Sequence, residues 1–145
     1  MHRRQLRWGP LAMSRFDRII EFKSASFPRN PRDAELANFE TMHGYALSRY
    51  IGLNLNQRGT LVNRYVGEDW GWYCEIRHKD FALAYGVLAE NDSEDFLVQF
   101  IPHKPFVRKL FRKIDLSEPL AKLQDDVFAI LQSAPSISGP AWIDA

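Results

Sequence analysis

The 145-residue sequence has little of several features that mark whole classes of proteins. Its single cysteine, Cys74, excludes a disulfide within the chain and suits a reducing compartment. No stretch approaches the roughly 18 uninterrupted apolar residues of a membrane-spanning helix. No continuous apolar run follows the basic residues after Met1, so we expect no secretory signal. We therefore expect a cytoplasmic protein.

The chain also has almost no excess of charge of either sign. It contains 19 lysine and arginine residues against 18 aspartate and glutamate residues, a net charge of +1. This balance gives no general attraction to nucleic acid or to an anionic membrane, so we do not expect nucleic acid as a partner. Apolar residues make up 46% and aromatic residues 13%, which is enough to form a folded core.

The length fits one domain, which we place at residues 14–145. Residues 1–13 precede the first recognisable strand pattern and are expected to be a mobile extension. Two interpretations of this basic segment remain open: an arm for nucleic acid, or a start codon assigned too early, with Met13 as the true start. The shortness of the segment favours the second.

An antiparallel meander is predicted between Thr60 and His103, where apolar runs are separated by short polar turns. Alternation along residues 70–78 places Trp70 and Trp72 on a core face together with Cys74 and Ile76. The opposite face then carries Tyr73, Glu75, Arg77, Ala82, Ala84 and Gly86. Strands are expected at residues 16–23, 60–66, 70–78, 81–88 and 96–101.

A long helix is predicted from about Pro31 to Ile51, since Asn30 can cap it and Gly52 can end it. A last helix is predicted from Ser117, as its N-cap, to a point before Pro135. The tail, residues 136–145, is expected to be a loop from which Trp142 packs back onto the domain.

Between the meander and the last helix, residues 104–113 combine apolar side chains at helical spacing with five cations on the other side. This pattern predicts a short basic amphipathic helix. Packing on the core is the preferred interpretation of that helix, and a basic patch for a partner comes next. The whole predicts an α+β fold: a two-layer sandwich with an antiparallel meander of four to five strands, two main helices on the Trp70 and Trp72 face, and the short basic helix.

No catalytic residue, metal ligand or cofactor site is expected. Cys74 and His78 stand four residues apart on one strand, about 13 Å, so they cannot act as a nucleophile and its base. We interpret Cys74 as a small core residue and His43 as a structural histidine of the first helix. The acidic pair Glu68 and Asp69 fits a solvated turn.

The segment Glu68-Asp69-Trp70-Gly71-Trp72-Tyr73, followed by strands, a basic segment and a terminal helix, resembles a set of small bacterial proteins whose function is uncharacterised. The resemblance covers residues 60–144. It implies a compact bacterial cytoplasmic domain, and it brings no catalytic residues with it.

Two classes of function remain open. The first is a non-enzymatic protein-binding module, such as an immunity protein or a regulatory adaptor; the second is a small hydrolase or nuclease that uses Glu68, Asp69, Glu75 and a histidine. For the binding module, a protein partner or a second copy of the chain would use the exposed sheet face and the basic segment, unless another part of the chain covers that face. The predicted partner-binding residues are Tyr73, Glu75, Arg77, Ala84, Arg108, Lys109 and Arg112.

Overall fold

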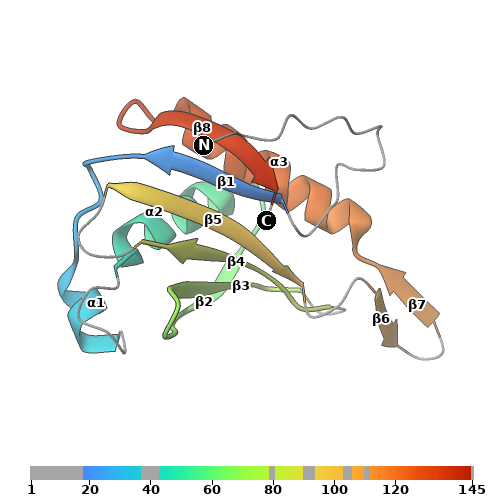
Figure 1. Ribbon diagram of the computed structural model, residues 1–145. Helices are drawn as coiled ribbons and strands as arrows, with labels where there is room; N and C mark the ends of the chain where they lie inside the picture. Colours follow the sequence, from blue (N-terminus) through green and yellow to red (C-terminus); the bar gives the residue numbers. More distant parts are fainter. Residues whose placement is uncertain are drawn as a thin grey trace.

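The computed structural model describes residues 18–36, 43–78, 81–89, 94–102, 106–109 and 112–144 of the chain, with the backbone alone for those between 102 and 115. The expected mobile extension, residues 1–13, lies outside these ranges. The described chain has the predicted α+β composition, with an open, six-stranded antiparallel sheet on which two main helices pack (Figure 1).

Five of the strands lie close to the predicted positions, and along most of them large apolar residues alternate with polar or small ones. The sheet order is β2-β3-β4-β5-β1-β8, with β2 and β8 at its edges. The first strand of the chain, β1, therefore lies between the last strand of the meander and the C-terminal strand. The strands are β1 (Arg18–Lys23), β2 (Val62–Gly67), β3 (Trp72–Ile76), β4 (Leu83–Leu88), β5 (Asp95–Pro102) and β8 (Ser138–Asp144).

The prediction of a loop for residues 136–145 is wrong, because β8 pairs antiparallel with β1 over most of this tail. Ile20 lies opposite Trp142 in the register. The Trp142 ring stacks on Phe128 at a centroid distance of 5.3 Å, and the Arg18 guanidinium lies 3.9 Å from the Trp142 centroid. The expectation that Trp142 packs onto the domain is thus confirmed, although it does so from a strand.

The predicted first helix is two helices, α1 (Pro31–Leu36) and α2 (Tyr45–Gln57), and residues 37–42 between them lie outside the described ranges. Gly44, directly before α2, has a φ of 139°, a value that residues other than glycine rarely adopt. Gly52 does not end a helix as predicted but lies inside α2. A Cβ atom there would stand 1.9 Å from the Tyr65 Oη atom, so glycine allows α2 to approach β2 closely.

The last helix, α3 (Ser117–Ser133), ends before Pro135 as predicted, although Leu116 rather than Ser117 occupies its N-cap position. The predicted basic helix is wrong. Those of its residues that the structure describes belong to two paired strands, the β6–β7 hairpin of β6 (Phe106–Lys109) and β7 (Arg112–Asp115), in which Val107 lies opposite Ile114. The hairpin lies beyond the end of β5, directly before α3 (Figure 1).

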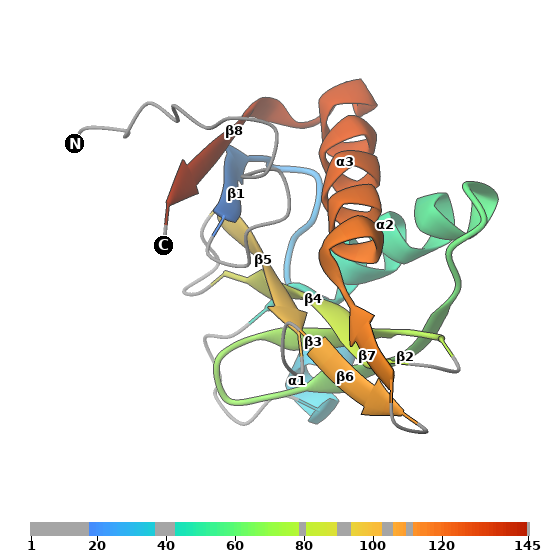
Figure 2. The same cartoon turned by 90° about the vertical axis from the view of Figure 1, so that its right-hand side faces the viewer.

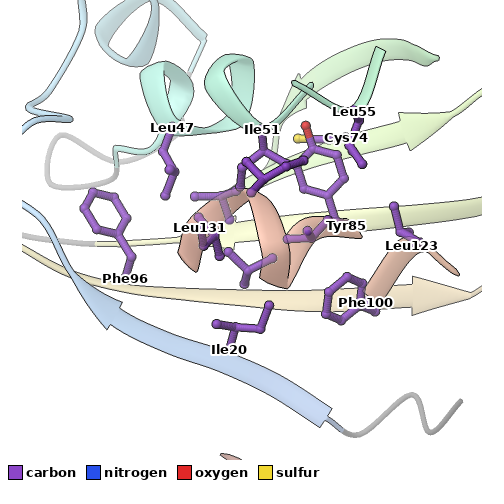
Figure 3. Packing of buried hydrophobic residues seen from close by; sticks show 14 of the residues in the cluster. Ile20, Leu47, Ile51, Leu55, Cys74, Tyr85, Phe96, Phe100, Leu123 and Leu131 are labelled. Carbon is purple, nitrogen blue, oxygen red and sulfur yellow. The ribbon is translucent and has the colours of Figure 1, made fainter. Parts of the chain in front are cut away.

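The core lies between the sheet and the two main helices, which sit side by side on one face (Figure 2). Leu47, Ile51 and Leu55 of α2 meet Cys74 and Tyr85 of the sheet (Figure 3). Burying this apolar surface is the main source of stability, at about 25 cal/mol per Å². The helix α3 adds Leu120, Leu123, Val127, Ile130 and Leu131.

The two tryptophans of the Trp-Gly-Trp segment do not share a face, contrary to the prediction. Trp72 is fully buried under the helices. Trp70 precedes β3, and its ring lies over Gly86, where a Cβ atom would stand 2.9 Å from the ring. Gly71, between them, has a φ of 155° and lies against the backbone of Val87. The regular alternation of side chains between the two faces of the sheet therefore does not extend from β3 back to Trp70. The helices therefore cover the face of the sheet that carries Trp72, and Trp70 lies on the opposite face.

Candidate functional site

A cleft of about 530 Å³ opens where three connections of the fold come together. The turn after α2 contributes Leu61, and the connection between β3 and β4 contributes Arg77 and Phe81. The first turns of α3 contribute Glu118 and Lys122. Such a volume lies within the roughly 300–1,000 Å³ of pockets that take ligands or anchoring side chains. The remaining lining residues are Gly59, Thr60, Ile76, His78, Leu83, Pro119 and Leu123.

The floor and one wall of the cleft are apolar. Ile76, Leu83 and Leu123 are core residues whose edges reach it. Leu61 is 45% exposed, although it is a large aliphatic residue. Phe81 stacks on the His78 ring at a centroid distance of 3.7 Å, which gives the mouth a flat aromatic wall. Transfer of an apolar side chain from water to these surfaces would be favourable.

The charged groups of the cleft are held in place by neighbouring residues. The backbone N–H of Arg77 donates to the Leu61 carbonyl at 2.9 Å, which joins two of the three connections. The Arg77 guanidinium donates to Asn63 Oδ1 at 3.3 Å. On the opposite side, Lys122 forms an ion pair with Asp126 at 2.6 Å. Arg77 and Lys122 thus line the cleft together with the acidic Glu118, and the Lys122 charge is paired with Asp126.

Of the predicted partner-binding residues whose side chains the structure describes, Arg77 is the one that lines the cleft. Glu75 lies further along β3, where it accepts a hydrogen bond from Asn63 Nδ2 at 2.7 Å and pairs with Arg64 at 3.3 Å. The Asn63 hydrogen bond, followed by the Arg64 charge, lowers the pKa of Glu75. Burial, and then the Glu75 charge, raises the pKa of Tyr73.

Two of the small residues predicted to form an exposed strip, Ala84 and Gly86, are buried instead. Ala84 has no exposed surface, and Trp70 lies over Gly86. Trp70 therefore covers the Gly86 part of this strip, whereas Ala82 is half-buried. Arg108, Lys109 and Arg112 belong to the β6–β7 hairpin, and their side chains lie outside the described part of the structure.

The acidic residues of the hydrolase alternative do not come together. Glu68 and Asp69 lie in the turn before β3, whereas Glu75 lies near its far end, bound to Asn63 and Arg64. Three residues of strand alone separate Trp72 from Glu75 by about 10 Å. Within the described ranges, no group of three or more histidine, cysteine or acidic side chains is placed to hold a metal ion.

Cys74 and His43 are both buried, as predicted for structural residues. Burial raises the pKa of the Cys74 thiol to about 12, although hydrogen bonds with Ser48 and Tyr85 oppose this effect. The His43 ring packs edge-on against Phe96 at a centroid distance of 5.5 Å. Neither residue lines the cleft.

Sequence reasoning missed the buried role of Asp33, a residue of α1. Asp33 has no exposed surface, and its Oδ1 atom accepts hydrogen bonds from Trp72 Nε1 at 2.7 Å and from the Tyr45 backbone N–H at 3.0 Å. Its Oδ2 atom accepts one from the Asn30 backbone N–H at 2.8 Å. The carboxylate thus ties α1, the start of α2 and β3 together.

Comparison with known proteins adds no relative: no family model, curated protein or solved structure matches the chain. None of the helices that the structure describes has the length and hydrophobicity needed to cross a lipid bilayer.

Proposed function

We propose that this protein is a non-enzymatic protein-binding module of the bacterial cytoplasm, of the kind represented by immunity proteins and regulatory adaptors. Its partner inserts an apolar side chain into the cleft between the α2–β2 turn, the β3–β4 connection and α3. The observation that carries the proposal is the cleft itself, in which an exposed Leu61 and a flat aromatic wall lie beside Arg77 and Lys122.

The chemistry of the cleft favours an apolar anchor next to an acidic residue on the partner. Apolar anchors that fill a pocket supply much of the energy of protein interfaces, and arginine is enriched among the residues that carry it. Charge complementarity with Arg77 would set the orientation of the partner and the rate of association. Glu118 at the same rim would disfavour a wholly acidic ligand.

A network of hydrogen bonds joins Arg77, Asn63 and Glu75 next to the cleft. It supports the proposal that the start of β2 and the end of β3 form the rim of the interface. Asn63 connects Arg77 with Glu75, so a partner that contacts Arg77 would also meet this network. Tyr73 and Glu75 therefore remain proposed partner contacts. The homodimer is the version of this proposal in which the partner is a second copy of the chain.

The proposal is tested by selecting phage-displayed random dodecapeptides on the immobilised full chain. We expect enrichment of peptides with a large apolar residue near an aspartate or glutamate. Leu61→Asp and Arg77→Glu should each weaken the binding of a selected peptide by roughly tenfold or more. Lys23→Glu is the matched charge-reversal control, since Lys23 is an exposed residue of β1 that does not line the cleft.

The control variant should bind the peptide with unchanged affinity, and circular dichroism should show all three variants folded. Failure to enrich any peptide that depends on Leu61 and Arg77 would refute the cleft as the recognition site. If the partner is a second copy of the chain, analytical ultracentrifugation should show the wild-type chain sedimenting as a dimer. The Leu61→Asp variant should then sediment as a monomer.

A further inference from the structure

A second surface, independent of the cleft, lies on the first half of α2 and the neighbouring strand β2. The Arg49 guanidinium stands 5.2 Å from the Tyr65 ring centroid and 6.0 Å from that of Tyr45. It also donates a hydrogen bond to the Tyr45 hydroxyl at 3.1 Å. Arg49 is exposed, so the charge is held at the surface between two aromatic rings.

Three other exposed arginines of the described structure form ion pairs with acidic residues, whereas Arg49 does not. Arg32 pairs with Glu35 at 2.8 Å, Arg58 with Asp126 at 3.3 Å and Arg64 with Glu75 at 3.3 Å. Among the residues that the structure describes, Arg49 has no such ion pair, and its contacts are with tyrosines. Because Arg49 is exposed, its other guanidinium donors can reach an external acceptor.

The position of this guanidinium is fixed from the core outward. Tyr45 packs edge-on against the buried Trp72 ring at a centroid distance of 5.0 Å. The Tyr45 backbone N–H and Trp72 Nε1 both donate to Asp33, which has no exposed surface. A side chain held in this way loses little conformational entropy when a ligand binds, which raises its contribution to affinity.

We propose that this surface, formed by Tyr45, Arg49, Leu53 and Tyr65, is a docking site for an acidic peptide segment of a protein partner. A carboxylate of the segment pairs with Arg49, in the planar geometry that guanidinium and carboxylate groups share. Leu53 follows Arg49 by one helical turn and is 54% exposed, so it receives an apolar side chain next to that carboxylate.

A peptide fits this surface better than a nucleic acid does. Binding to a phosphate backbone depends on several cations that each neutralise a phosphate. Among the described residues, one further cation contacts either of the two tyrosines. It is Arg32, whose charge is already paired with Glu35. The combination of tyrosine, arginine and an exposed leucine matches the composition of protein interfaces.

The test is a differential selection of phage-displayed random dodecapeptides on the wild-type chain, with an excess of soluble Arg49→Gln protein as competitor. Only peptides that require Arg49 are then recovered. We expect them to carry an aspartate or glutamate beside an apolar residue. A synthetic copy of the most enriched peptide should bind Arg49→Gln at least about tenfold more weakly than wild type, and Arg49→Lys with an intermediate affinity.

Arg64→Gln is the matched control, because it removes a comparably exposed guanidinium from β2, and it should leave the affinity unchanged. Replacing the acidic residue of the peptide by its amide should weaken binding to wild type and have no further effect with Arg49→Gln. Recovery of no peptide, or of peptides without an acidic residue, would overturn the proposal. So would binding of a dodecathymidine oligonucleotide that Arg49→Gln abolishes, which would assign the surface to nucleic acid. If the peptide binds Arg49→Gln weakly but binds the cleft variant Leu61→Asp as tightly as the wild type, its binding site is this surface and not the cleft.

Discussion

Asp33 is a single residue on which three parts of the fold depend. Its buried carboxylate accepts three hydrogen bonds, from Trp72 Nε1 and from the backbone N–H groups of Asn30 and Tyr45. Asp33→Asn keeps the shape but replaces an accepting oxygen by an NH₂ group that faces donors. We expect a loss of about 2–4 kcal/mol in the free energy of unfolding, measured by urea denaturation.

The matched control for this prediction is Glu35→Gln, two residues further along α1. Glu35 is exposed and pairs with Arg32, so its replacement should cost less than about 1 kcal/mol. Equal stabilities of the two variants would show that the Asp33 contacts do not hold α1 to the core.

Cys74 makes the stability of the protein sensitive to alkaline pH. Burial raises the pKa of its thiol to about 12 in the folded state, and it raises that of the neighbouring Tyr85 well above its ordinary value. An unfolded thiol ionises near pH 8.5, so the stabilising contribution is complete below that pH and is lost as the pH rises toward 12. The slope for one such group is at most about 1.4 kcal/mol per pH unit.

We therefore expect the free energy of unfolding of the wild type to fall between pH 9 and 11, and to fall less steeply in Cys74→Ala. Urea denaturation at a series of pH values measures both slopes. Identical slopes would mean that the thiol is already ionised, or exposed, in the folded protein. At neutral pH the native thiol should react slowly with iodoacetamide, because burial and the raised pKa both oppose attack.

At the scale of elements, the contact between α2 and β2 rests on a glycine. A Cβ atom at Gly52 would stand 1.9 Å from the Tyr65 Oη atom and 2.9 Å from its Cζ atom. Alanine is favoured over glycine in helices by about 1 kcal/mol, yet overpacking typically costs about 1–3 kcal/mol. We expect Gly52→Ala to lower the free energy of unfolding by roughly 1–2 kcal/mol, measured by urea denaturation.

Two further variants separate the steric effect from helix propensity. Tyr65→Phe removes the closest atom, so adding it to Gly52→Ala should restore part of the lost stability. Asn56→Ala, at an exposed position of the same helix, should change stability by less than about 0.5 kcal/mol. A Gly52→Ala protein as stable as the wild type would contradict the close packing of α2 on β2.

The central strands of the meander, β3 and β4, could be predicted from the sequence because large apolar residues alternate with polar or small ones along them. The hairpin of β6 and β7 could not, since the apolar residues between Phe106 and Ile114 also fit a helical spacing, and pairing between strands leaves no signal in such short segments. The strand β8 contains Gly139 and Pro140, which normally indicate a turn. Gly139 has a φ of 61°, and the β1–β8 register shifts between Glu21 and Lys23, so the strand is irregular where the sequence suggests a break.

At the scale of the whole molecule, the cleft is assembled from connections that lie far apart in the sequence. Leu61, Arg77 and Lys122 belong to three separate segments, and each looks like an ordinary surface residue in its own segment. Arg77 was predicted as a partner contact from its outward position on the expected strand 70–78, and that prediction stays open. Leu61 carried a local signal, a large aliphatic residue between a polar turn and a strand, but nothing in the sequence related it to α3.

The most direct test of the proposed function is to map where a bound peptide lies. Uniformly ¹⁵N-labelled protein would be titrated with a cleft-dependent peptide selected by phage display, and backbone amide shifts would be followed by NMR. We predict the largest shift changes at Leu61, Arg77, Phe81 and Lys122, with little change at Lys23 on β1. Changes confined to other surfaces, or none at peptide concentrations that saturate the wild-type chain in the selection assay, would contradict the cleft as the binding site.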